Sequence, residues 1–211
     1  MSALATLLAL ADSRLPAGGH VHSGGVEEAV TSGLVTGLDS LEAFLCRRIR
    51  SSGLVSASIA AAVQRGDLTP DAADRETDAR TPAPAAREAS RSQGRGLARL
   101  ARRVWPDADW AEIGARPHLA VTAGRVGAIS GLNPEHTALT IVYTTMTGSA
   151  TAAQRLLALD PADVAACTFR LADLCERTAA EAAIGLADLS DPLLDTLAQR
   201  HAERARPLFV S

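Results

Sequence analysis

Apolar side chains return every three or four residues along most of this 211-residue chain, the spacing of a helix face buried in a core. The longest such row consists of Leu139, Val142, Met146, Ala150, Ala153 and Leu157. Residues 139–145 are rich in β-branched side chains, but the helical spacing continues beyond them. The pattern predicts an all-α fold: a single globular domain of about eight to ten helices over residues 1–211, with 205–211 as a flexible tail.

Glycine positions predict where several helices end. Gly53 is expected to break one helix, and Gly66 to end the alanine-rich helix that follows it. The first helix is expected to bury one apolar face, formed by Leu4, Leu7, Leu8 and Ala11.

Residues 12–28 form the most unusual stretch, because two glycine pairs flank His20-Val-His22. Glycine permits positive φ angles and close backbone approach, so this stretch is predicted to be a shaped loop between two helices. Glu27 and Glu28 follow in the first turns of the second helix, where the helix dipole favours acidic side chains. The loop is therefore either a binding element or a structural corner.

Three kinds of chemistry can be tested against this loop. His20 and His22 could bind nickel or zinc, but two histidines alone do not make a site and no further ligands stand at metal spacing beside them. The loop lacks the Lys-Ser/Thr of a phosphate-binding P-loop, and residues 21–25 miss the Gly-x-Ser-x-Gly elbow because Val21 stands in place of its first glycine. Loop packing is favoured over metal binding, and the chain shows no catalytic constellation.

Arginines recur at i+4 spacing on the helix expected over residues 85–105. They are Arg87, Arg91, Arg95, Arg99 and Arg103. Two interpretations stay open: a solvated helix face, or a surface that binds carboxylates of a partner protein. Nucleic acid is disfavoured, because the interleaved residues offer no aromatic ring for stacking and the chain has a net charge of −3.

The apolar run of residues 3–11 is too short for a membrane span and lacks the basic start of a signal peptide. We therefore expect a cytoplasmic protein without a membrane partner.

Three stretches of the chain carry a recognisable family pattern. The first is residues 7–16, Leu-Leu-Ala-Leu-Ala-Asp-Ser-Arg-Leu-Pro, followed by Gly18-Gly19 and by residues 22–27, His-Ser-Gly-Gly-Val-Glu. The others are Ser-Arg-Ser-Gln-Gly at 90–94, with Leu97 and Leu100, and the C-terminal residues 200–211. Together with the small-residue segment 118–131, they resemble the UreF family of urease accessory proteins over essentially the whole chain. The lysine-free, alanine-rich composition resembles that of an actinobacterial member. The chain departs from the family at His20, where an aromatic is common, and near Asp160, where a family glutamine is lost.

The resemblance implies a non-enzymatic, all-α homodimer without a cofactor or a bound metal of its own. Such a protein would act as a scaffold or chaperone that links UreD (also called UreH) and the GTPase UreG to apo-urease during nickel insertion. Its C-terminal tail is expected to become ordered on binding. The candidate partner-binding residues are His22, Glu27, Arg87, Arg91, Arg95, Arg204, Arg206, Leu208 and Phe209.

Two other classes of protein are the alternatives. A TetR-like all-α transcriptional regulator has a similar length, but it needs a basic helix-turn-helix near the N-terminus. Residues 1–40 carry four acidic side chains against Arg14 alone, which argues against that class. A helical metal-binding protein using His20 and His22 is the other alternative.

Overall fold

Helices account for all the regular structure of the described chain. The computed structural model describes residues 2–210, except for the side chain of His20, and this part contains no strand. Its α-helices are α1 (Ala3–Ala11), α2 (Val26–Thr31), α3 (Leu38–Arg48), α4 (Leu54–Arg65), α5 (Pro70–Ala79), α6 (Pro84–Val104), α7 (Leu119–Ser130), α8 (Pro134–Leu157), α9 (Pro161–Arg170), α10 (Ala172–Ile184) and α11 (Pro192–Ala202). A 3₁₀ turn, η1 (Gly19–Val21), and a π-helical turn, η2 (Ile49–Gly53), complete the set. The predicted all-α fold is confirmed, with ten helices if α9 and α10, which abut at Leu171, count as one.

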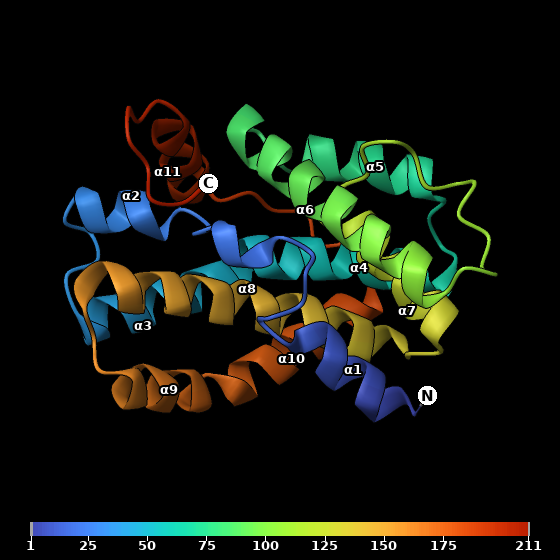
Figure 1. Cartoon of the computed structure of the whole chain (residues 1–211), viewed down its shortest axis with the longest axis horizontal. Coiled ribbons are helices and arrows are strands. Elements are labelled where there is room, and N and C mark those ends of the chain that lie inside the picture. Colours follow the sequence, from blue (N-terminus) through green and yellow to red (C-terminus); the bar gives the residue numbers. More distant parts are fainter. Residues whose placement is uncertain (1, 211) are drawn as a thin grey trace.

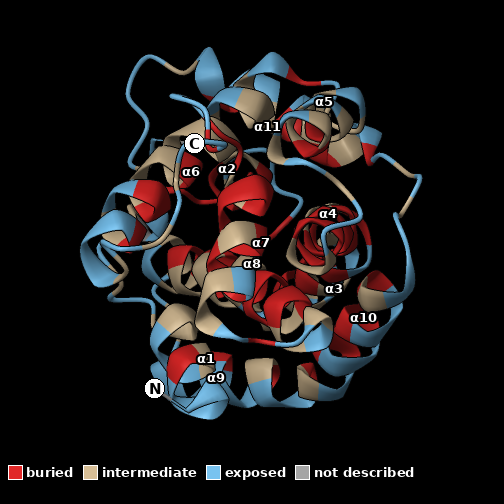
Figure 2. Ribbon diagram, turned by 90° about the vertical axis from the view of Figure 1, so that its right-hand side faces the viewer, coloured by how far each residue is buried: buried red, intermediate tan, exposed pale blue. Residues whose placement is uncertain are grey.

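Helix α4 lies at the centre of the molecule and is buried on almost every side (Figure 2). It packs against α7, α8 and α10, so it needs small side chains, which Ala60, Ala61 and Ala62 supply. Helix α7 approaches α4 closely, because a Cβ atom at Gly124 would lie 2.5 Å from the carbonyl oxygen of Ala60. Glycine at this crossing is therefore a packing requirement.

The remaining helices surround this centre (Figure 1). Helix α8 crosses the molecule and contacts α1, α2, α3 and α9, while α6 lies over α7 on another side. Helix α11 packs between α2 and α6, which brings the C-terminal end of the chain beside the N-terminal glycine loop. None of the helices in the described part has both the length and the hydropathy needed to cross a membrane.

Two local predictions are wrong, each for a physical reason. Gly53 does not break a helix, because it adopts helical angles (φ −64°, ψ −52°) at the end of the π turn that joins α3 to α4. A Cβ there would lie 3.0 Å from the carbonyl oxygen of Arg48, so close packing accounts for the glycine. In α1, Leu4 and Leu8 are 65% and 62% exposed, while Thr6 is buried. Because α1 is apolar on nearly all sides, its spacing could not show which face is buried.

The α4–α7 crossing yields a prediction about stability. Gly124→Ala should lower the free energy of unfolding by about 1–3 kcal/mol, because the new methyl group overpacks the crossing. Gly148→Ala in α8 is the matched control: a Cβ there meets no atom within 4 Å, and alanine favours the helix by up to about 1 kcal/mol. Urea denaturation of the two variants measures both effects, and equal stabilities would contradict the packing argument.

Candidate partner-binding site

The glycine loop packs against a half-buried arginine at the end of α3, Arg48. Gly24 has a φ of +63°, and a Cβ at this position would lie 2.6 Å from the guanidinium of Arg48. That guanidinium donates a hydrogen bond to the carbonyl oxygen of Gly24, while its Nε has no partner among the described residues. Burial lowers the pKa of Arg48 to about 10, so the side chain stays charged at neutral pH. Arg48 thus fixes the loop at Gly24, where a side chain on residue 24 would clash with the guanidinium.

Beside this loop, the carboxylate of Glu27 joins the start of α2 to the C-terminal segment. Glu27 is only 2% exposed. Its Oε1 accepts the backbone N–H of Leu208 at 2.8 Å, and its Oε2 accepts the N–H of Phe209 at 3.0 Å. Nε2 of His201, on α11, lies 2.8 Å from the same Oε2. One buried carboxylate therefore connects α2, near the N-terminus, with α11 and with residues 208–209, near the C-terminus.

Hydrogen bonding decides the ionisation of Glu27. Burial alone would raise the pKa of this carboxyl group, because it disfavours the charged form. The N–H groups of Leu208 and Phe209, together with His201, outweigh burial and hold the pKa of Glu27 below its ordinary value of 4.5. The carboxylate is charged at neutral pH and has several donors.

The structure brings together most of the candidate residues predicted at this end of the molecule. His22 is buried in the loop, and the Arg204 guanidinium contacts Glu28 Oε2 at 3.0 Å. Leu208 is 79% exposed although its backbone is bound, whereas Phe209 packs against the core. Arg206 is exposed and makes no ion pair within the described residues. The side chain of His20 and residue Ser211 lie outside the described part, and the flexibility of 205–211 stays a prediction.

The candidate arginines of α6 lie elsewhere and pair within the chain. Arg91 contacts Asp74 and Asp78 at 2.8 Å each, while Arg87 lies 3.7 Å from Asp78. Arg95 lies 3.6 Å from Glu88. Further along the helix, exposed arginines make no ion pair within residues 2–210; these are Arg99, Arg102 and Arg103. Arg87 and Arg91 thus fasten α6 to α5, Arg95 pairs within α6, and the C-terminal arginines face solvent.

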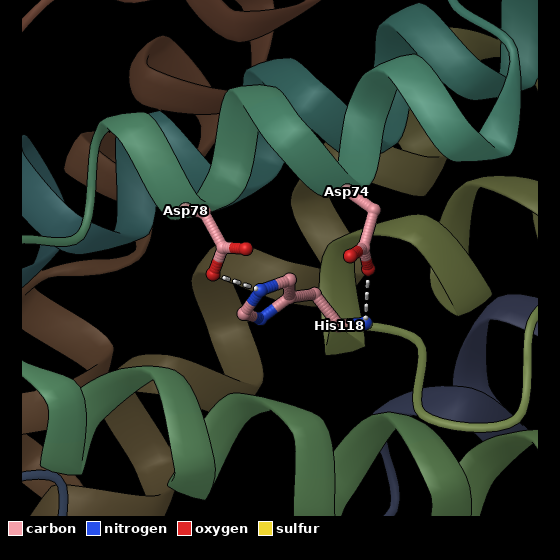
Figure 3. A group of neighbouring side chains, drawn as sticks. All are labelled: Asp74, Asp78 and His118. Carbon is pink, nitrogen blue, oxygen red and sulfur yellow. Dashed lines mark hydrogen bonds and ion pairs between the residues drawn. The ribbon is translucent and has the colours of Figure 1, made fainter.

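Next to Arg91, the side chain of His118 lies at the centre of a polar junction between helices (Figure 3). Its side chain is fully buried, with Nδ1 3.0 Å from Ser90 Oγ on α6 and Nε2 3.0 Å from Asp78 Oδ1 on α5. The backbone N–H of His118 donates to Asp74 Oδ1 at 3.2 Å. Burial lowers the pKa of His118, and the Asp78 carboxylate opposes that shift. A neutral imidazole with both nitrogens bonded therefore joins α5, α6 and the start of α7.

The atoms at this junction could in principle hold a metal or act as a Ser-His-Asp relay. Ligand atoms of Asp74, Asp78 and His118 lie within 4.8 Å of one another. However, the Arg91 guanidinium already bonds both carboxylates and supplies the positive charge. The Ser90 hydroxyl also accepts the N–H of Leu119 at 3.3 Å, and the neighbouring open cleft is not lined by Ser90. The geometry favours a structural junction over a metal centre or a nucleophile.

No sequence pattern marks His201, His118 or Arg48 as a site residue. Each has other polar residues close by in the sequence, so nothing local distinguishes it, and its partners are far away in sequence. The buried state of Glu27 was also missed, because an acidic residue in a first helical turn is normally explained by the helix dipole. The donors that bind Glu27 are the backbone N–H groups of residues 208 and 209. Because every residue except proline has such a group, the sequence cannot identify them.

The chain is similar in sequence to known proteins over its whole length. The family model described as UreF matches residues 35–172. A protein of Mycobacterium marinum named "Urease accessory protein UreF" is 80% identical over 211 residues, covering 100% of both chains. Proteins of the same name from Mycobacterium tuberculosis (strain H37Rv) and Mycobacterium sp. (strain JLS) are 75% and 74% identical, each also over 100% of both chains.

The Glu27 junction yields a prediction with a neighbouring control. Glu27→Gln should lower the free energy of unfolding by about 1.5–3 kcal/mol, because it weakens charge-assisted hydrogen bonds and leaves buried groups poorly matched. Glu28→Gln removes one half-buried ion pair and should cost about 1 kcal/mol or less.

The effect of Glu27→Gln should also depend on pH. The folded-state pKa of Glu27 is lowered, so its contribution is present above pH 4.5 and is lost as the pH falls below that value. Chemical denaturation of wild type and variant at pH 7 and pH 3.5 measures this. A stability difference that does not shrink at pH 3.5 would contradict the assignment.

The His118 junction predicts a different pH window. Because the folded-state pKa of His118 is lowered, the unfolded chain binds more protons below its ordinary value of 6.5. Stability should therefore fall as the pH decreases from 6.5, by at most about 1.4 kcal/mol per unit for this group. His118→Gln should be less stable at pH 7.5 and should lose this part of the slope. Parallel stability profiles for wild type and variant between pH 7.5 and 5 would exclude the explanation.

Proposed function

Because this chain belongs to the UreF family of urease accessory proteins, we propose that it is a non-enzymatic scaffold or chaperone for urease maturation. It joins a UreD-type protein (also called UreH) and the GTPase UreG to apo-urease in the cytoplasm while nickel is inserted. Nickel is the cargo of this assembly, and the chain itself has no resident cofactor. It acts as a homodimer, as the family resemblance implies.

The observation that carries this proposal is the junction on Glu27. It gathers residues from the glycine loop, α2, α11 and the C-terminal segment into one surface. Its buried groups bond to one another, while exposed apolar side chains beside a charged one remain available to a partner protein. Leu208 and Val210 are 79% and 67% exposed at this surface, and Arg206 lies two residues before Leu208. We assign the contact with the UreD-type protein to this end of the molecule.

The arginines of α6 contribute a second surface. Arg87, Arg91 and Arg95 were the candidates from sequence, and their pairing with acidic residues of this chain gives them a structural role first. The unpaired cations further along α6 are suited to carboxylates of a maturation partner.

Neither alternative class is favoured. Membership of the UreF family replaces the TetR-like interpretation. A metal site on His20 and His22 has little support, because His22 is 7% exposed within the packed loop.

Co-purification tests the proposed function. The chain should co-purify with the UreD-type protein from the same urease operon and, in the resulting assembly, with UreG. Deleting Arg206 to Ser211 should abolish retention of the UreD-type protein while the helical content measured by circular dichroism is kept. Ile184→Ser is the matched control, since Ile184 is 87% exposed on α10, and it should leave retention unchanged. Full retention by the truncated chain would refute the assignment.

A further inference from the structure

An apolar hollow lies at the surface between α1 and the C-terminal half of α6. Ala9 and Leu10 form its wall on α1, and Leu100 and Val104 form its wall on α6. Eight of its nine lining residues are apolar, and the ninth is Thr6. Val104 is 47% exposed at this place, so the hollow is open to solvent.

The walls of the hollow are held in place by close packing. A Cβ atom at Gly96 would lie 2.1 Å from the carbonyl oxygen of Ala17, so the segment that follows α1 lies directly on α6. At the end of α6, the carbonyl oxygen of Trp105 accepts the indole N–H of Trp110 at 3.0 Å. Leu15 and Trp105 both line the hollow and pack against the core. The hollow is therefore formed by the folded chain itself.

The volume of the hollow decides what can enter it. It measures about 70 Å³. Pockets for small molecules usually measure about 300–1,000 Å³, so this one is too small for a cofactor. It has room for one aliphatic side chain, such as that of leucine. A concave site of this size suits a side chain that projects from a protein segment rather than the flat surface of a bilayer.

Unpaired arginines border the hollow on one side. At about 100° per residue, Arg103 lies about 60° around the α6 axis from Leu100, and Arg99 lies one turn before Arg103. Both arginines are exposed and make no ion pair within residues 2–210. Arg102 is also exposed and unpaired within that range, but it lies about 160° around the axis from both Leu100 and Val104. Two guanidinium groups thus stand beside the hollow, and a third points away from it.

We propose that this hollow, together with Arg99 and Arg103, binds an acidic amphipathic helix of a partner protein. One aliphatic side chain of that helix fills the hollow, and carboxylates on its flank pair with the two guanidinium groups. Helix α1 carries no charged residue, so the acidic side chains of the partner should lie only on the flank that faces α6. The site lies outside α2, α11 and the C-terminal segment, and is therefore separate from the contact assigned to the UreD-type protein.

This site rests on the proposed function, since it gives the second surface on α6 its chemistry and its anchor point. Its test uses a peptide and needs neither the UreD-type protein nor UreG, so the site and the scaffold function can fail separately. The probe is a fluorescein-labelled helical peptide with leucines at i, i+3, i+4 and i+7 and glutamates along one flank. The control peptide carries glutamine in place of each glutamate.

Fluorescence anisotropy with the full-length protein gives the dissociation constant of each peptide. Wild type should bind the glutamate peptide at least about fivefold more tightly than the glutamine peptide at about 50 mM salt, and this ratio should shrink at about 500 mM salt. Arg103→Glu should weaken binding of the glutamate peptide at least about tenfold. Arg102→Glu changes the net charge equally but should weaken binding less than about threefold, because residue 102 faces away from the hollow.

Ala9→Leu tests the hollow itself. Ala9 is exposed on α1 and lines the hollow, so a leucine there should occupy the space and weaken binding of both peptides at least about tenfold, without lowering the melting temperature. Ala3→Leu is the matched control, since Ala3 is exposed on the same helix and does not line the hollow. It should leave both dissociation constants unchanged.

Four results would overturn the proposal. The first is a wild-type protein that does not bind the glutamate peptide below about 1 mM, and the second is an equal effect of Arg102→Glu and Arg103→Glu. The third is binding that Ala9→Leu leaves intact, because charge attraction alone would then explain it. The fourth is a change of molecular mass in solution caused by Ala9→Leu without peptide, which would make a second copy of this chain the occupant. Binding of wild type, but not Arg103→Glu, to phosphatidylserine vesicles in place of the peptide would assign the surface to a membrane instead.

Discussion

The close crossing of α4 with its neighbours is the constraint on which the rest of this molecule depends. A helix surrounded on nearly all sides can be reached by other backbones only if its own side chains, or theirs, are small. Ala60 on α4 and Gly124 on α7 satisfy this where the two helices cross. Once α7, α8 and α10 are placed around α4, the outer helices have defined surfaces on which to pack, and the two ends of the chain meet.

Two polar junctions then join the elements around this centre to one another. His118 ties α5, α6 and α7 together through Ser90 and Asp78, and Glu27 ties α2 to α11 and the C-terminal segment. Both junctions bury a titratable side chain whose hydrogen-bonding groups have partners, which is the condition for placing such groups in a low-dielectric interior. The first junction is structural. The second combines structure with the surface assigned to partner binding, because the buried carboxylate controls where exposed aliphatic side chains lie.

The helical pattern predicts helices correctly where it is long. Local predictions are wrong where one residue type is compatible with two structural roles. The α8 row from Leu139 to Leu157 was recognised as helix despite its β-branched residues. Gly53 was misread, because a glycine that ends a helix and one that admits a close backbone look alike in sequence. The arginine row on α6 was seen, but its division into paired and free halves depends on acidic residues of α5 and of α6 itself.

The amino-acid sequence by itself determined the all-α class, the glycine-rich corner between the first two helices and the family. These features are local, since they depend on periodicity, glycine conformation and motif identity over short spans. Only the tertiary structure decided that Glu27 is buried, that His201 and the N–H groups of 208–209 are its partners, and that Arg48 supports the loop. Those contacts join residues as far as 182 positions apart. No local pattern encodes them, because they arise only when helix packing has brought α2, α3 and α11 together.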